Sequence, residues 1–136
     1  MAKSWSEKFN NGRVPEIETC QKSFGGVPAE KKFIISTPKE IDSYIQTIPE
    51  GHYVSFQKMK QDISNQYEVG FMCPLTAGIF IRNVAELAFE NYSKNQKIKE
   101  ITPYWRVIDL KIPLVKKLSF GSDFVKEMRQ VEGLPL

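Results

Sequence analysis

An apolar stripe at helical spacing is the feature that most limits how this chain can fold. Between Pro74 and Ser93, apolar or small side chains recur three and four residues apart, which places them on one side of a long helix. Proline suits the first position of such a helix because its φ is already fixed there. The helix needs apolar partners along its length, so the sequence predicts a domain built around it. The predicted buried stripe is Ile81, Val84, Ala85, Ala88 and Tyr92.

Caps and residue preferences predict the shorter elements around this helix. Ser4 with Glu7 predicts a capped helix at the start of the chain, Thr37 before Pro38 predicts a second, and Ser55 predicts a third. The third should turn Phe56, Met59 and Ile63 inward. Lys31–Thr37 is rich in β-favouring residues and predicts a strand, whereas the intervals 10–28 and 64–72 favour loops.

The segment after the long helix predicts a strand, a loop and a closing helix. We expect a strand over Trp105–Leu110 and a loop or wing over Lys111–Gly121. Ser122 is in position to cap the closing helix. The inward side chains of that helix should be Phe124, Val125, Met128 and Val131.

Composition sets broad limits. With 136 residues, 41% hydrophobic and 26% charged, the chain is typical of one folded domain. Its net charge is +3, and the excess lies after residue 93, where nine Lys and Arg face five Asp and Glu. A solvated mixed-charge surface explains this excess better than a nucleic-acid site does.

Neither a metal site nor a membrane segment is expected. Cys20, Cys73 and the single His52 fit no metal-ligand spacing, so we expect reduced thiols, no metal and no cofactor. No apolar run approaches the length of a membrane span, and the first residues lack the apolar core of a signal peptide. We therefore expect a cytoplasmic protein without membrane contact.

Separated motifs, in order, resemble those of the alkylguanine-DNA alkyltransferases. They are Ile48–Ser64 (IPEGHYVSFQKMKQDIS), Thr102–Ile108 (TPYWRVI) and Phe124–Leu134 (FVKEMRQVEGL). Lys3-Ser4-Trp5 and Cys73–Phe80 (CPLTAGIF) make the chain more similar to a sub-group of small alkyltransferase-like proteins. The resemblance implies an α/β, mostly α fold. Residues 37–136 would form a winged helix-turn-helix of the alkyltransferase C-terminal domain type, with residues 1–36 as a helix and extended segment packed on it.

The resemblance also implies that this chain lacks the alkyl-transfer reaction of the family. Tyr104 stands in place of the alkyl-accepting cysteine and Trp105 in place of the histidine that activates it. A phenol with a pKa near 10 is a far weaker nucleophile at neutral pH than an activated thiol. Phe56 aligns with the base-rotating tyrosine. The arginine that fills the space of a flipped base aligns with Gly78 or a close neighbour, while Arg82 lies about one helical turn later.

Two groups of candidate site residues result, each with a plainer interpretation beside it. Tyr104, Trp105 and Arg106 form either a remnant pocket that stacks a flipped base or simple core, with Arg106 structural. The candidate DNA-binding residues are Ser55, Phe56, Lys58, Thr76, Gly78 and Arg82. The small residues at 76–78 would allow close approach to a phosphate backbone or tight helix packing. Cys73 is interpreted as a small buried residue rather than a relocated nucleophile.

Two classes of function remain open. The favoured one is a non-enzymatic protein that binds duplex DNA weakly and senses damaged or alkylated bases in repair. The alternative is a winged-helix module that binds a protein partner and has lost DNA binding. The missing arginine favours the alternative, as do Glu86 and Glu90, which we expect on the polar side of the long helix.

Overall fold

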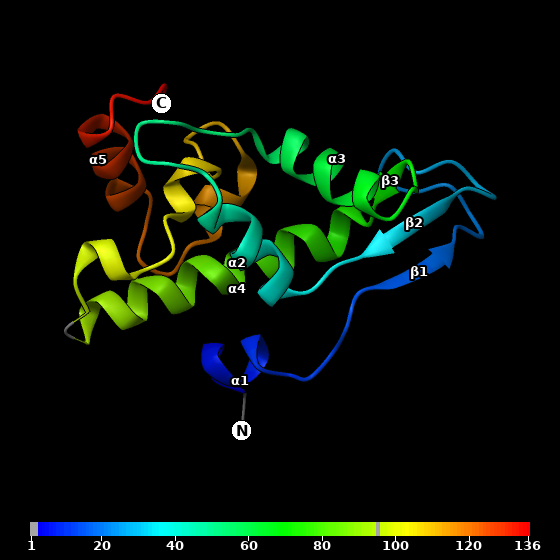
Figure 1. Cartoon of the computed structure of the whole chain (residues 1–136), viewed down its shortest axis with the longest axis horizontal. Coiled ribbons are helices and arrows are strands. Elements are labelled where there is room, and N and C mark those ends of the chain that lie inside the picture. Colours follow the sequence, from blue (N-terminus) through cyan, green and yellow to red (C-terminus); the bar gives the residue numbers. More distant parts are fainter. Residues whose placement is uncertain (1–2, 95) are drawn as a thin grey trace.

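The computed structural model describes residues 3–94 and 96–136, with about half of the chain in helices and a small three-stranded sheet. Figure 1 shows the sheet at one end of the molecule, α5 at the other, and α4 running between them. In chain order the elements are α1 (Trp5–Phe9), β1 (Glu16–Thr19), β2 (Lys32–Ile35), α2 (Pro38–Gln46), α3 (Phe56–Gln66), β3 (Phe71–Met72), α4 (Pro74–Ser93), three 3-10 turns η1 (Ile98–Glu100), η2 (Tyr104–Arg106) and η3 (Pro113–Lys117), and α5 (Asp123–Val131). The mixed, mostly helical class predicted from the sequence is confirmed.

The long helix α4 is the centre of the fold. It begins at Pro74 as predicted and contacts α1, α2, η2 and η3. Ile81, Val84, Ala85 and Ala88 are buried in the main core, which confirms most of the predicted stripe. The inclusion of Tyr92 was wrong, because 38% of that residue is exposed where the helix extends beyond the core. Its ring rests instead against Phe124, with centroids 5.4 Å apart.

Most of the predicted helix starts are confirmed by their hydrogen bonds. The hydroxyl of Thr37 accepts from the backbone N–H of Glu40 at 3.1 Å, and Ser55 accepts from Lys58 at 3.0 Å. Ser4 forms a capping box with α1. The cap predicted at Ser122 was wrong, because its backbone already has helical φ and ψ of −95° and −10° and its side chain makes no capping bond.

The sheet joins the first third of the chain to the start of α4. β1 pairs antiparallel with β2, and β2 pairs parallel with β3 through Phe33 opposite Phe71 and Ile34 opposite Met72. The backbone N–H of Cys73 then donates to the carbonyl of Ile34 at 2.9 Å, which fixes where α4 begins. Only β2 was predicted. The division into residues 1–36 and 37–136 stays a prediction.

The strand predicted over Trp105–Leu110 is wrong. The backbone N–H of Arg106 donates to the carbonyl of Pro103 at 3.0 Å, and Ile108 donates to Tyr104 at 2.9 Å, so the chain forms the turn η2. A strand would send alternate residues to opposite faces. Here Tyr104, Trp105, Val107 and Ile108 are all buried in one core, which a tight turn permits. Residues 96–136, all of which are described, contain no strand, and Lys111–Gly121 is a loop around η3.

Helix α5 turns a different face inward than its apolar residues predict. Val125 is fully buried and Phe124 and Met128 pack partly on the core, but Val131 is 70% exposed. Expecting Val131 inward was wrong because Arg129, and Glu132 just after the helix, occupy the interior. Among the described residues, no helix is both long and apolar enough to cross a membrane.

Candidate functional site

The carboxylate of Glu132 accepts hydrogen bonds from groups in and around Tyr104–Arg106, which we call the acceptor-like motif. Trp105 donates its indole N–H to Oε2 at 2.7 Å, and Arg106 donates from Nε to Oε1 at 2.9 Å and from Nη2 to Oε2 at 3.1 Å. The backbone N–H of Gly51 donates to Oε1 at 3.0 Å. The remaining guanidinium nitrogen of Arg106 donates to the carbonyl of Ile48 at 2.8 Å. One buried carboxylate therefore ties the segment at 48–51, η2 and the end of α5 together.

The charge of Glu132 is stabilised by these donors. Burial alone would raise the pKa of its carboxyl group, but the hydrogen bonds from Arg106, Trp105 and Gly51 outweigh burial and hold that pKa below its ordinary value. The side chain is 3% exposed and that of Arg106 is 14% exposed, so the ion pair is largely shielded from water. The structural role expected for Arg106 is what its contacts indicate.

A second buried cation also binds the backbone of the turn η2. Arg129 is 2% exposed and donates from Nη1 to the carbonyl of Trp105 at 2.6 Å and from Nε to the carbonyl of Pro135 at 2.6 Å. Its guanidinium lies 5.5 Å from the ring centroid of Tyr53. This role could not be predicted from the sequence, because Lys and Arg on a helix are ordinarily solvated.

Tyr104 lies inside the core. It is 0% exposed, and its ring makes edge contacts with Trp105 and Phe120 at centroid separations of 5.2 Å and 5.8 Å. Burial, with the nearby charge of Glu86, raises the pKa of its phenol above the ordinary value. Its hydroxyl has no hydrogen-bond partner among the described residues. The phenol therefore stays protonated at neutral pH and offers neither a nucleophile nor an open ring face.

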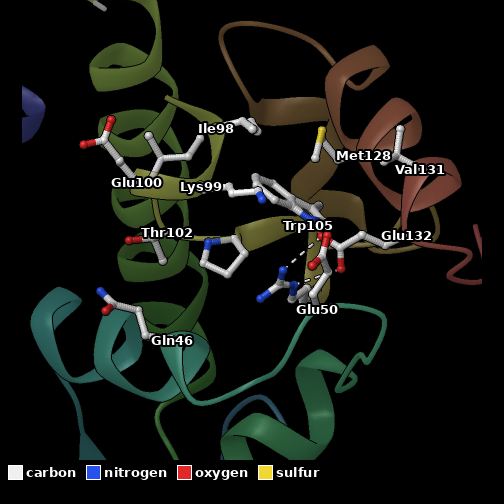
Figure 2. A pocket seen from close by; sticks show the side chains of 13 residues that line it. Gln46, Glu50, Ile98, Lys99, Glu100, Thr102, Trp105, Met128, Val131 and Glu132 are labelled. Carbon is white, nitrogen blue, oxygen red and sulfur yellow. Dashed lines mark hydrogen bonds and ion pairs between the residues drawn. The ribbon is translucent and has the colours of Figure 1, made fainter. Parts of the chain in front are cut away.

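A pocket of about 560 Å³ opens beside the motif, on the side of Trp105 and Arg106 (Figure 2). Trp105 lies at its centre, and side chains reach it from the end of α2, from η1 and from α5. Its lining mixes apolar groups with charges of both signs. Tyr104 is not part of the lining, so the structure separates it from the two neighbours grouped with it from sequence. We call this cavity the acceptor-like pocket.

On α3 the predicted DNA-binding residues are partly engaged within the protein. Ser55 caps the helix, and Phe56 is half-buried with the ammonium of Lys60 4.8 Å from its ring centroid. The side chain of Lys58 is 63% exposed but pairs with Asp62 at 3.1 Å. The charge of Lys58 is thus partly offset before any ligand arrives.

The first half of α4 presents a small, apolar face to solvent. Leu75 is 69% exposed and Ile79 is 55% exposed, one turn apart. Between them, a Cβ added at Gly78 would meet no other described atom within 4 Å, so tight internal packing does not require a glycine there. The hydroxyl oxygen of Thr76 is buried and has no hydrogen-bond partner in the part of the chain that the structure describes. We call Leu75, Gly78 and Ile79 the open face of α4.

Arg82 lies at the border of this face and contacts two other groups. Its guanidinium carbon is 5.3 Å from the ring centroid of Trp5, and its Nε is 3.3 Å from the carboxylate of Glu86. Placing Glu86 on the polar side of the helix was wrong. It is 3% exposed and accepts hydrogen bonds from the backbone N–H, at 2.8 Å, and the hydroxyl of Ser119, whose donors satisfy the buried charge.

The remaining sequence candidates are the two cysteines and the histidine. Cys20 and Cys73 are free thiols, buried in a separate small cluster with Val27 and Phe33. His52 is exposed. Across residues 3–94 and 96–136, no three His, Cys, Asp or Glu side chains gather as metal ligands would. Comparisons with protein-family models, curated proteins and solved structures find no match to this chain.

Proposed function

We propose that this chain is a non-enzymatic, cytoplasmic DNA-binding protein of the alkyltransferase-like winged-helix type, and that it holds duplex DNA against the open face of α4. The observation that carries the proposal is the exposure of Leu75 and Ile79 on either side of Gly78, while Ala77 and Ile81 on the same helix are fully buried. The start of α4 is therefore firmly anchored yet leaves one side uncovered.

The chemistry of the open face suits the minor groove. Proteins that bind there insert apolar side chains between base steps and bend the duplex. A glycine allows the helix backbone to come close to the sugar-phosphate chain. Leu75 and Ile79 supply the apolar side chains, and Gly78 supplies the close approach. Such contacts carry little sequence information, so the binding should be nearly independent of sequence.

On α3 and on the loop after η2, few cations are available to contact phosphates, which limits affinity. Lys58 and Lys60 lie on α3, and Lys111, Lys116 and Lys117 are exposed on the loop in the place of a wing. With each neutralised phosphate contributing about −0.9, we expect a slope of roughly −3 to −5 for log affinity against log salt. Titration of a fluorescent duplex at several salt concentrations measures this slope. A lack of binding even at low salt would refute the proposal.

The same proposal excludes alkyl transfer. The phenol of Tyr104 is buried and protonated, the indole of Trp105 donates to Glu132 and has no basic nitrogen, and both thiols are buried. Incubation with duplex carrying radiolabelled methylguanine should leave the protein unlabelled, and Tyr104→Cys should not restore transfer. Stoichiometric label on the wild-type protein, for example on Cys73, would contradict this part of the proposal.

Recognition of damaged bases would involve the acceptor-like pocket. A flipped base needs a cavity with hydrogen-bonding groups, and the pocket offers Thr102 and Gln46 at its margin. Trp105 is 2% exposed, so it supplies part of the wall and little ring surface for stacking. Tighter binding to a duplex with one methylguanine than to the unmodified duplex is the expected result. Equal affinity for the two duplexes would refute the proposal of damage sensing but not the proposal of DNA binding.

A second candidate is an interaction module for a protein partner. Exposed Leu75 and Ile79 favour it, because exposed apolar side chains that lie together are typical of protein interfaces. The pairing of Lys58 with Asp62 also favours it, since it reduces the charge that α3 offers to DNA. The salt titration separates the two candidates, since a protein-binding face would show no affinity for DNA at any salt concentration.

A further inference from the structure

A second pocket, of about 330 Å³, lies between α1 and α4 next to the open face. Four cationic side chains line it, and no carboxylate belongs to the lining that the structure describes. The cations are Lys3, Lys8, Arg13 and Arg82, and Trp5 lines the pocket with them. The other pocket described above has charges of both signs, so this basic lining distinguishes the site. We call it the Trp5 pocket.

The segment that carries three of these cations is held firmly on α4. Ser4 and Glu7 close a capping box around α1, with both hydrogen bonds at 3.1 Å. Asn83 is 3% exposed and donates from its side-chain amide to the backbone carbonyl of Trp5 at 2.9 Å. A buried amide on the long helix thus fixes the position of the indole. The pocket is preformed by the fold.

Trp5 orders two of the cations without neutralising them. The ammonium of Lys8 lies 4.5 Å from its ring centroid and the guanidinium carbon of Arg82 lies 5.3 Å from it. A cation–π contact restricts a side chain by attraction to the ring but leaves its charge free to bind an anion. Two acids adjoin the pocket: Glu7, bound to Ser4, and Glu86, which contacts Arg82. Four cations against two acids leave an excess of positive charge.

We propose that the Trp5 pocket binds phosphate groups of the DNA strand that continues from the open face of α4. This inference rests on the proposed function and assigns a role to the N-terminal segment. Ile79 and Arg82 line the pocket, and Ile79 also belongs to the open face, so the two surfaces are continuous. Phosphate is favoured over a base because the indole is already engaged with cations. Backbone contacts of this kind fix the register of a duplex without reading its sequence.

The double variant Lys8→Gln/Arg13→Gln tests the inference. Both residues are exposed, so the fold should survive, and thermal unfolding checks this. The magnitude of the salt slope for a fluorescent duplex should fall by about two, and affinity at low salt by about tenfold or more. The matched control is Lys31→Gln/Lys32→Gln, which removes the same charge from exposed lysines at the start of β2. Neither lysine lines the Trp5 pocket, and Figure 1 shows the sheet at one end of the molecule, away from α1.

The outcomes separate this inference from the proposed function. Equal slopes for the two double variants, with wild-type binding intact, would overturn the inference alone. Failure of the wild-type protein to bind duplex would overturn both. Poly-glutamate tests whether the ligand is an acidic protein. If poly-glutamate binds the wild-type protein in place of DNA and loses affinity for Lys8→Gln/Arg13→Gln, the pocket binds an acidic protein. The nucleic-acid assignment would then be wrong.

Discussion

Trp105 donates its indole N–H to the carboxylate of Glu132 at 2.7 Å, which joins the turn of the acceptor-like motif to the residue that ends α5. Arg106 binds the same carboxylate through two nitrogens. If the proposed alkyltransferase-like assignment holds, the position of Trp105 corresponds to that of a catalytic histidine. Here the contact with Glu132 positions a buried aromatic side chain, and the motif acts as a structural link.

Replacement of Glu132 with Gln should destabilise the fold substantially. The amide preserves the size of the side chain but leaves the guanidinium of Arg106 without an anion in a largely buried place. Loss of one partner of such a pair costs about 3 kcal/mol, measured as the free energy of unfolding in urea. Glu127→Gln is the matched control, because Glu127 is exposed on α5, the helix that Glu132 follows. Equal effects of the two substitutions would contradict the assigned role of Glu132.

The same carboxylate should make stability depend on acid pH. Because folding lowers the pKa of Glu132 below 4.5, its contribution is fully present above that pH and is lost as the pH falls through the lower, folded value. Wild-type protein should therefore lose more stability than Glu132→Gln between about pH 6 and pH 3. The pKa of Asp62 is lowered as well, chiefly by the hydrogen bond from Tyr44, but that contribution is common to both proteins and cancels. Parallel pH profiles would refute the prediction.

Tyr104→Phe should stabilise the protein. The hydroxyl of Tyr104 is buried and has no partner within residues 3–94 and 96–136, so the folded state has lost its hydration without compensation. Removal of the hydroxyl should raise the free energy of unfolding by about 1 kcal/mol, with no change in DNA affinity. A clear loss of stability would mean that a bound water molecule satisfies the phenol.

Gly78→Ala should separate stability from binding. The new methyl group points into open space and alanine favours the helix, so unfolding should cost about 0.5–1 kcal/mol more. The same methyl group would hold the DNA backbone away from α4 and weaken duplex binding. A more stable variant with unchanged affinity would show that DNA does not approach the helix at Gly78.

Local signals in the sequence were enough to predict most of the helices. Thr37 before Pro38 and the apolar stripe after Pro74 each act within a few turns of their own helix, and the structure follows them. β1 and β3 are short, and their residues lie in intervals that favour loops, so they exist only through their pairing with β2. The strand expected at Trp105 failed because tertiary burial of consecutive residues overrides β propensity.

The candidate site was less predictable because its charges pair over long distances in the sequence. Arg106 and Glu132 are 26 residues apart, and Glu86 and Ser119 are 33 residues apart. Periodicity places such charges on a solvent face, as it did for Glu86, since it contains no information about partners on other elements. The exposure of Leu75 and Ile79 is likewise a property of the assembled fold.

The affinity of Ile79→Glu for a labelled duplex at low salt tests the binding face of α4 most directly. Ile79 is 55% exposed, so the substitution should leave the fold intact while it places a carboxylate where DNA is expected. Gln130→Glu, at an exposed position on α5 outside the lining of the acceptor-like pocket, controls for added negative charge. We expect Ile79→Glu to weaken binding by about tenfold or more relative to Gln130→Glu. Equal affinities for the two variants would show that DNA, if bound, does not lie on α4.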